Sequence, residues 1–138
     1  MKPIAPAQGI AFAFPDVCQT PAPPGSPVPI PYPNIAQLSD ADAVTSESNK
    51  ELLVGPNGDF VLLEGAVIET STGDEAGSVG GVTSGKIKGK CEITQASSSV
   101  KYGPEGKGIV RFMDTTMQNE GNASGFVMGA FPTVLVGD

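Results

Sequence analysis

The chain has 138 residues, 39% of them hydrophobic, with 18 glycines, 13 prolines and no histidine, and its formal net charge is −7. This length suits one domain with a single modest core, and the acidic charge disfavours nucleic acid as a partner because it repels phosphate. The lack of histidine removes the usual general base near neutral pH, so we expect no catalytic residues and a protein that is not an enzyme.

The N-terminal residues show no export or membrane signal. Met1–Pro6 contains two prolines and too short an apolar run for a signal peptide, and no stretch approaches the roughly 18 apolar residues of a membrane helix. We therefore expect assembly in the cytoplasm, with any export by a route other than general secretion. Cys18 and Cys91 do not make a disulfide framework, so both are expected to be reduced.

The first part of the chain is rich in proline. Ten of the thirteen prolines lie before residue 34, and each fixes φ near −65° and disfavours helix at the preceding residue. Val28, Ile30 and Tyr32 alternate with prolines. We therefore expect residues 1–34 to form an extended strap, as polyproline II or an irregular edge, packed on the β body of a single domain covering residues 1–138.

The segment after the strap is polar and contains the one plausible short helix, with Ser39 or Asp40 as its N-cap. From residue 51 onward, short apolar runs are separated by glycine, which predicts a mainly β fold of short strands and hairpins. The clearest hairpin turn is Gly55–Gly58. The same pattern recurs at residues 102–106, and more loosely at 129–136, which suggests internal pseudo-symmetry.

Between the two clearer hairpins, the segment Gly73–Gly89 contains six glycines, which predicts a long loop. Partial alternation over Lys86–Thr94 predicts a strand. Three lysines would lie on one face of that strand, where they protect an exposed edge: Lys86, Lys88 and Lys90.

No motif in the chain supports catalysis. Gly80–Lys86 opens like a phosphate-binding loop, but Ile87 stands where a Ser or Thr must reach magnesium, and the flanking strand and helix are missing. Asp74 and Glu75 are adjacent carboxylates in a glycine-rich stretch, which a solvated loop explains better than an acid–base pair. Asn122 begins a formal glycosylation sequon, which we interpret as a turn.

An unusual motif opens the chain, in which Phe14–Pro21 is followed by the alternating segment Pro27–Ala36. Further matching stretches are Ser71–Gly77, Val82–Lys86, Val110–Asp114 and Pro132–Gly137. Together they span most of the chain and resemble the PAAR-like domain family, related to the PAAR proteins that sharpen type VI secretion spikes. The resemblance implies a small cone of short β-strands and hairpins with long loops and little helix.

The resemblance also implies a structural role at the tip of a contractile injection machine. Relatives sit as one copy on the trimeric β-helix of a VgrG-like spike and make transient contact with a target membrane. The expected function is a spike-tip protein of a type VI or related system, assembled in the cytoplasm and then translocated. The alternative is an adaptor that binds a separate toxic effector and loads it onto the spike. Because the chain stops at Asp138, we expect any cargo to be bound non-covalently or carried by another subunit.

Family members hold zinc near the tip with a cysteine and several histidines. Cys18 matches that cysteine, but other residues stand at the histidine positions: Phe112, Gln118 and Glu120. Cys18 with Cys91 and a carboxylate would make only a weak zinc set. We therefore expect no metal and no cofactor, with the tip held by apolar packing of Phe112, Met113 and Met117.

Overall fold

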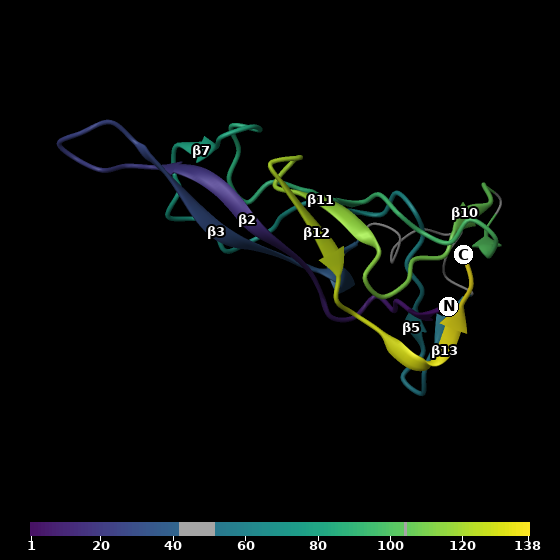
Figure 1. Cartoon of the computed structure of the whole chain (residues 1–138). Helices are drawn as coiled ribbons and strands as arrows, with labels where there is room; N and C mark the ends of the chain where they lie inside the picture. Colours follow the sequence, from purple (N-terminus) through teal and green to yellow (C-terminus); the bar gives the residue numbers. More distant parts are fainter. Residues whose placement is uncertain (42–51, 104) are drawn as a thin grey trace.

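The computed structural model describes residues 1–41, 52–103 and 105–138, which form mainly short antiparallel strands (Figure 1). This confirms the mainly β fold expected from the sequence. The described residues include one 3₁₀ turn, η1 (Leu38–Asp40), and none of their helical structure has the length and apolar character to cross a bilayer. The strands are β1 (Lys2–Ile4), β2 (Ile10–Thr20), β3 (Val28–Gln37), β4 (Leu53–Val54), β5 (Asp59–Phe60), β6 (Val67–Ile68), β7 (Gly80–Gly81), β8 (Cys91–Ile93), β9 (Lys101–Tyr102), β10 (Lys107–Gly108), β11 (Thr115–Gln118), β12 (Ala123–Val127) and β13 (Phe131–Val136).

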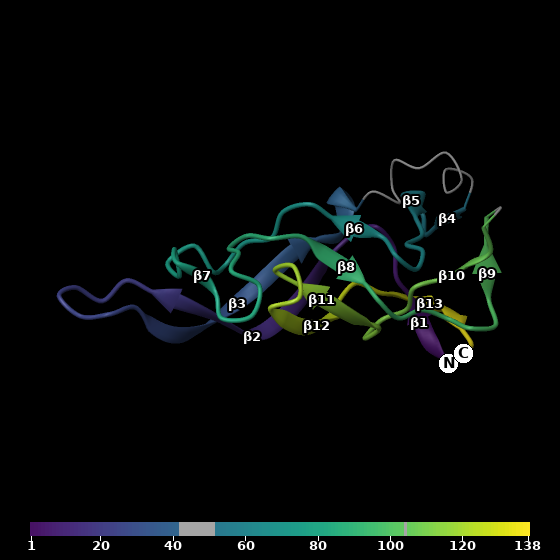
Figure 2. The ribbon, with the colours of Figure 1, turned by 90° about the horizontal axis from the view of Figure 1, so that it is seen from above.

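The largest sheet has the order β3-β2-β12-β11-β8-β6, and β7 pairs with the outer part of β2. Figures 1 and 2 show β2 and β3 continuing as a ribbon away from the rest of the sheet, at the end opposite the two termini. On this ribbon Val28 and Ile30 are 44% and 37% exposed. The packing expected of these two side chains on the body is therefore not seen, because the ribbon extends beyond it.

Prolines protect the outer edge of β3. The backbone N–H of Ile35 points away from β2 and donates to the Thr72 carbonyl at 2.8 Å. Since strand residues alternate at period two, Pro29, Pro31 and Pro33 share this outward orientation. They remove donors that would otherwise be unpaired at a sheet edge, which is where prolines are tolerated in strands. The expected irregular proline-rich edge is thus a regular edge strand.

Three smaller two-stranded sheets gather at the end where the termini lie (Figures 1 and 2). The turn Gly55–Gly58 joins β4 to β5 with a 3.1 Å hydrogen bond from the Gly58 N–H to the Gly55 carbonyl. Gly103 and Gly106 make the matching 3.0 Å bond between β9 and β10. Both predicted hairpins are confirmed. The third copy is wrong, because β13 pairs with β1 rather than with its own neighbours in sequence.

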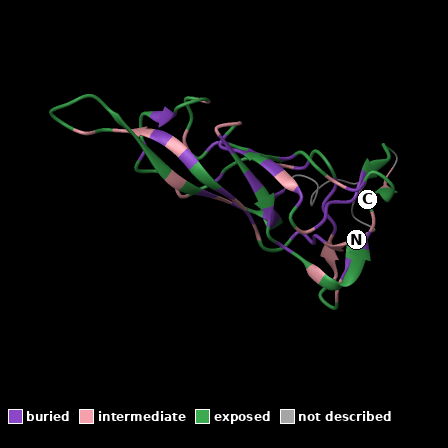
Figure 3. Ribbon diagram, in the orientation of Figure 1, coloured by how far each residue is buried: buried purple, intermediate pink, exposed green. Residues whose placement is uncertain are grey.

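Within the described residues, two apolar clusters form the core, and buried segments run through both ends of the body in Figure 3. The larger lies under the main sheet and includes Leu38, Leu62, Ile68, Ile93 and Val127. The smaller is built where the three two-stranded sheets meet, from Ile4, Val54, Val61, Leu63, Ile109 and Val136. Each such side chain contributes roughly 1.5–3 kcal/mol on burial.

Two expected elements take another form. The start of the segment expected to be helical, Ile35–Gln37, belongs to β3 and is followed by η1, while residues 42–51 lie outside the described residues. Residues 86–90 precede a strand rather than form one, since β8 begins at Cys91. Lys88 has φ of 53°, which no strand allows.

Candidate functional site

Three chain segments close on one another in a ring of backbone hydrogen bonds. The Ala5 N–H donates to the Val110 carbonyl at 3.0 Å, Val110 to Leu62 at 3.0 Å, and Leu62 back to Ala5 at 3.2 Å. All three residues are fully buried. Each segment therefore donates to one neighbour and accepts from the other, the arrangement that a threefold axis produces.

A second ring of hydrogen bonds joins the same three segments, with donors and acceptors in the opposite order around the ring. Each donor lies two residues after a ring member, and each acceptor lies two residues before the ring member of another segment. The backbone N–H groups donate to carbonyls from Ala7 to Phe60 at 2.7 Å, from Glu64 to Gly108 at 2.9 Å and from Phe112 to Pro3 at 2.8 Å. Three antiparallel bridges follow the same rotation: Ile4 with Arg111, Val61 with Pro6, and Ile109 with Leu63. The three segments are thus equivalent in position and contact, although their sequences differ.

Each segment leaves one of the three two-stranded sheets. Leu62 follows β5, Val110 follows β10, and Ala5 follows β1, whose partner is β13. The hydrogen bonds from Gly58 to Gly55 and from Gly106 to Gly103 close the first two sheets, whereas the N- and C-terminal residues lie where the third turn would be. We call this end of the molecule, comprising β1, β4, β5, β9, β10 and β13 with the ring, the threefold platform.

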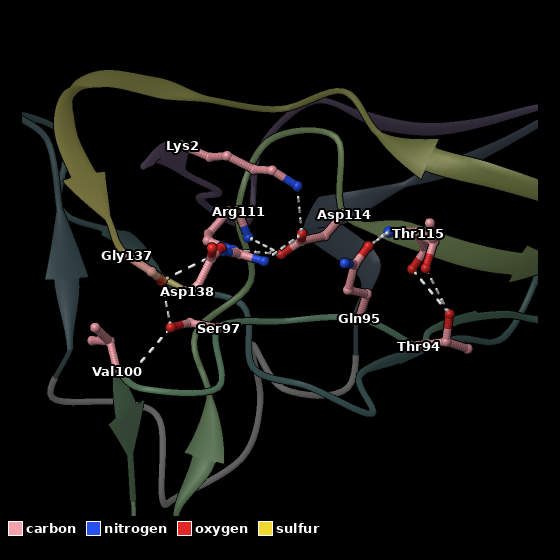
Figure 4. A network of polar contacts seen from close by, with 10 residues as sticks. All are labelled: Lys2, Thr94, Gln95, Ser97, Val100, Arg111, Asp114, Thr115, Gly137 and Asp138. Carbon is pink, nitrogen blue, oxygen red and sulfur yellow. Dashed lines mark hydrogen bonds and ion pairs between the residues drawn. The ribbon is translucent and has the colours of Figure 1, made fainter.

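An ion-pair network centred on the buried Arg111 and Asp114 ties the chain ends into the platform (Figure 4). Arg111, 3% exposed, donates through Nε and Nη2 to Asp114 at 3.1 and 3.0 Å, and through Nη1 to Asp138 at 2.7 Å. Lys2 on β1 also contacts Asp114, at 3.4 Å. The hydrogen bonds to Asp114 raise the pKa of the Arg111 guanidinium, which therefore stays charged.

A second cluster, entirely polar, lies beside β7 in the half of the body away from the termini. Its centre is the buried Asp16 carboxylate on β2. Oδ2 accepts a hydrogen bond from Asn34 Nδ2 at 3.1 Å, and Oδ1 accepts from Asn119 Nδ2 at 3.2 Å, from Asn122 Nδ2 and from the Cys18 thiol, whose sulfur lies 3.6 Å away. We call these residues, with Asp74, Ser71 and Gln118, the polar cluster.

Two titratable groups in the polar cluster are strongly shifted. Burial and a hydrogen bond to Asp16 raise the pKa of Asp74 from 3.8 to about 6, against the lowering effect of the Lys88 N–H. Asp74 therefore keeps a proton and shares it with Asp16 under mildly acidic conditions. Burial, followed by the nearby Asp16 and Asp74 charges, raises the pKa of the Cys18 thiol to about 12, so this thiol stays protonated and unreactive.

The outer members of the polar cluster are satisfied by each other. Gln118 Nε2 donates to Asn34 Oδ1 at 2.8 Å, and Asn34 Nδ2 donates to Ser71 Oγ at 2.8 Å. Ser71 in turn donates to the Gly89 carbonyl at 2.7 Å. Because Asp74 and Ser71 are fully buried, the expectation of a solvated loop at Asp74 is wrong for that residue and holds for its exposed neighbour Glu75.

The family's zinc positions do not come together here. Gln118 lies in the polar cluster, Glu120 is exposed, and the backbone of Phe112 bonds to Pro3 in the platform. Cys91 belongs to the larger apolar cluster. The expected apolar brace is also wrong, since Met113 and Met117 are each 39% exposed and cannot form a core with Phe112.

The polar cluster does not fit a zinc ion. Asp16, Cys18 and Asp74 place three donor atoms within 4.8 Å of one another, whereas a closed zinc site uses four ligands with thiolate or imidazole prominent. The two oxygens of Asp16 already accept four hydrogen bonds, about as many as a carboxylate has lone-pair positions. Both oxygens of Asp74 accept from the Lys88 N–H.

Sequence reasoning missed most of the polar cluster, although a signal was present. Asp16, Asn34 and Asp74 each lie in a stretch that carries the family resemblance, at Phe14–Pro21, Pro27–Ala36 and Ser71–Gly77 respectively. In each stretch, a polar residue inside an otherwise apolar or glycine-rich motif was the signal that could have indicated a buried polar site. That these three side chains meet follows only from the tertiary structure.

Comparison with known proteins supports the resemblance. A family model described as the toxin PAAR-like domain matches residues 9–125. DNase toxin Tse7 of Pseudomonas aeruginosa is 39% identical over 119 residues, which cover 82% of this chain and 29% of that protein. No solved structure gives a significant match.

This relative overturns the expectation of a protein that is not an enzyme, because a protein named as a DNase toxin shares this domain. The expectation rested on the absence of histidine. That absence describes only the matched part, which is less than a third of the relative, and so does not decide what the relatives of this chain catalyse. Since the family model covers most of its length, the chain belongs to the toxin PAAR-like domain family.

Proposed function

We propose that this chain caps the end of a trimeric, VgrG-like spike, one copy per trimer, and delivers a toxin of the nuclease class with it. The toxin part of the proposal is supported by the family and by the name of the DNase toxin relative. Assembly would take place in the cytoplasm, and the cap would leave the cell at the tip of the spike.

The threefold platform is the observation that carries the docking part of the proposal. A trimer presents three identical edges around one axis, and an asymmetric monomer can match only one of them. A single chain with three equivalent segments, related by the rotation that joins Ala5, Leu62 and Val110, can match all three at once. The end of a β-helical shaft also has unpaired strand edges, which need a β surface to cover them.

Exposed apolar side chains lie at equivalent positions on the platform. Leu53 of β4 pairs with Phe60, and Leu135 of β13 pairs with Pro3, and these partners provide carbonyls for the outer hydrogen-bond ring. Leu53 and Leu135 are 51% and 53% exposed. The third equivalent position is Lys101 on β9. Exposed leucines at two positions that the platform's rotation relates fit a surface that a partner covers.

The docking part is tested by mixing the chain with the C-terminal end of candidate spike trimers and measuring the mass of the complex by light scattering. We expect one chain per trimer. Replacing Leu53 and Leu135 together with Glu should weaken binding at least about tenfold, since a charge must then be buried. Val28→Glu on the ribbon, at a side chain 44% exposed, is the matched control and should bind normally. Three chains per trimer, or equal binding by both variants, would contradict the proposal.

The toxin part needs a separate experiment. The native protein that contains this chain, purified with whatever it binds, is incubated with plasmid DNA and magnesium. Cleavage is expected, and its absence over a range of divalent cations would rule out the nuclease assignment without affecting the docking result.

A further inference from the structure

We propose that a metal-free hydrogen-bond network centred on Asp16 braces the end of the body away from the platform in this chain, in place of the zinc that the family resemblance implies. The inference is independent of spike docking. It starts from the mismatch between the polar cluster and a zinc site, and it assigns the bracing role to named carboxamides.

The carboxamides stabilise the buried Asp16 carboxylate, as a bound cation would otherwise do. Asn34, Asn119 and Asn122 each aim an N–H at this fully buried carboxylate. Hydrogen bonds to the charged form stabilise a buried carboxylate that has no counter-ion. Removing such a donor leaves a buried charge unsatisfied, which costs more than the hydrogen bond itself.

The same carboxamides also use their remaining atoms, so they are fixed in orientation. Asn119 accepts from the Gly89 N–H at 2.9 Å and donates to the Lys86 carbonyl at 2.7 Å. Asn122 accepts from the Thr83 N–H at 2.8 Å and donates to the Val17 carbonyl at 3.0 Å. Turning either amide to present oxygen to a metal would break bonds on both sides.

The network joins segments that are far apart in sequence. Asp16 is on β2, Asn34 on β3, Asp74 in the loop before β7, and Asn119 and Asn122 in the turn between β11 and β12. The longest link spans 106 residues. Connecting these segments at one point is the bracing that a structural metal provides in small domains with little core.

Glycines let the backbone pack directly on these amides. A Cβ at Gly81 would lie 2.3 Å from Asn122 Cγ, and one at Gly89 would lie 2.7 Å from Asn119 Oδ1. Contacts this close leave no room for a side chain, so the loop containing β7 is fitted to the carboxamides themselves. This second observation supports a network that is complete as it stands.

Metal analysis of the whole chain tests the proposal directly. The chain is expressed in medium supplemented with zinc, purified without chelator, and measured for bound metals and for its melting temperature with EDTA and with added zinc chloride. We expect well under one metal ion per chain and no change in melting temperature. One zinc ion per chain, with a lower melting temperature after its removal, would overturn the proposal.

Two substitutions separate the network from a metal site. Asn34→Leu removes the donors to Asp16 and Ser71 and should lower the melting temperature by about 10 °C. Gln19→Leu is the matched control on the adjacent strand, because the buried Gln19 Oε1 has no hydrogen-bond partner, and it should not lower the melting temperature. Cys18→Ser keeps a donor for Asp16 and should shift it by less than about 4 °C, whereas loss of a zinc ligand would have a large effect. Equal losses from Asn34→Leu and Gln19→Leu would count against the network.

Discussion

Replacing Asp74 with Asn should make the protein more stable at neutral pH and leave it unchanged in acid. Asp74 is fully buried, its carboxyl hydrogen bonds to Asp16, and both its oxygens accept from the Lys88 N–H. A neutral amide of the same shape can still donate to Asp16 and accept from Lys88. The substitution therefore keeps the contacts and removes only the possibility of a second buried charge.

The magnitude follows from the pKa of Asp74, which is raised from 3.8 to about 6 in the folded protein. Because the native state holds this proton more tightly than the unfolded state, stability is highest below about pH 4. It falls as the pH rises through about 6 and is constant above that. At about 1.36 kcal/mol per pKa unit, the loss for wild type is about 3 kcal/mol, and Asp74→Asn should not show it.

Urea unfolding at several pH values from 4 to 7 measures this difference. Carboxyl groups that do not contact Asp74 contribute equally to both proteins and cancel when the two curves are subtracted. Glu75→Gln, at the exposed neighbouring position, is the matched control and should run parallel to wild type. If the curves of Asp74→Asn and wild type are also parallel, the shared-proton interpretation of Asp16 and Asp74 is refuted. A variant less stable at pH 7 would point to a bound cation instead.

Three further substitutions test the packing of the body. Leu62→Ala should lower the free energy of unfolding by about 2–5 kcal/mol in urea, because Leu62 is fully buried in the ring. Arg111→Met should cost about 3–5 kcal/mol at pH 7, since the buried Asp114 carboxylate loses its two-point partner. Gly77→Ala should cost about 1–3 kcal/mol, seen as a lower melting temperature, because a Cβ there would lie 2.3 Å from that of a buried cysteine on β2.

Each of these has a control of the same chemistry. Leu53→Ala removes a leucine that is 51% exposed, and Lys107→Met removes an ion pair of 3.5 Å with Glu105 at the surface. Gly25→Ala is the control for Gly77→Ala, because the nearest atom to a Cβ at Gly25 is 3.5 Å away. All three controls should stay within about 1 kcal/mol of wild type. Losses as large as those of the core variants would show that burial does not set these energies.

The fold class and two of the hairpins could be predicted because their determinants are local. Gly55–Gly58 and the turn at Gly103–Gly106 supply the positive φ values and short chain reversals that a hairpin needs. Each turn is flanked by two-residue strands, β4 and β5 in the first hairpin and β9 and β10 in the second. The motifs Phe14–Pro21 and Pro27–Ala36 were long enough to identify the family.

Tertiary structure alone decided the third sheet and both candidate sites. No turn motif predicts the pairing of β1 with β13, because the two strands come from opposite ends of the chain. Asp74 was expected in solvent and lies buried beside Asp16. Side chains brought together across many residues are set by packing of the whole body, and no local sequence pattern encodes that.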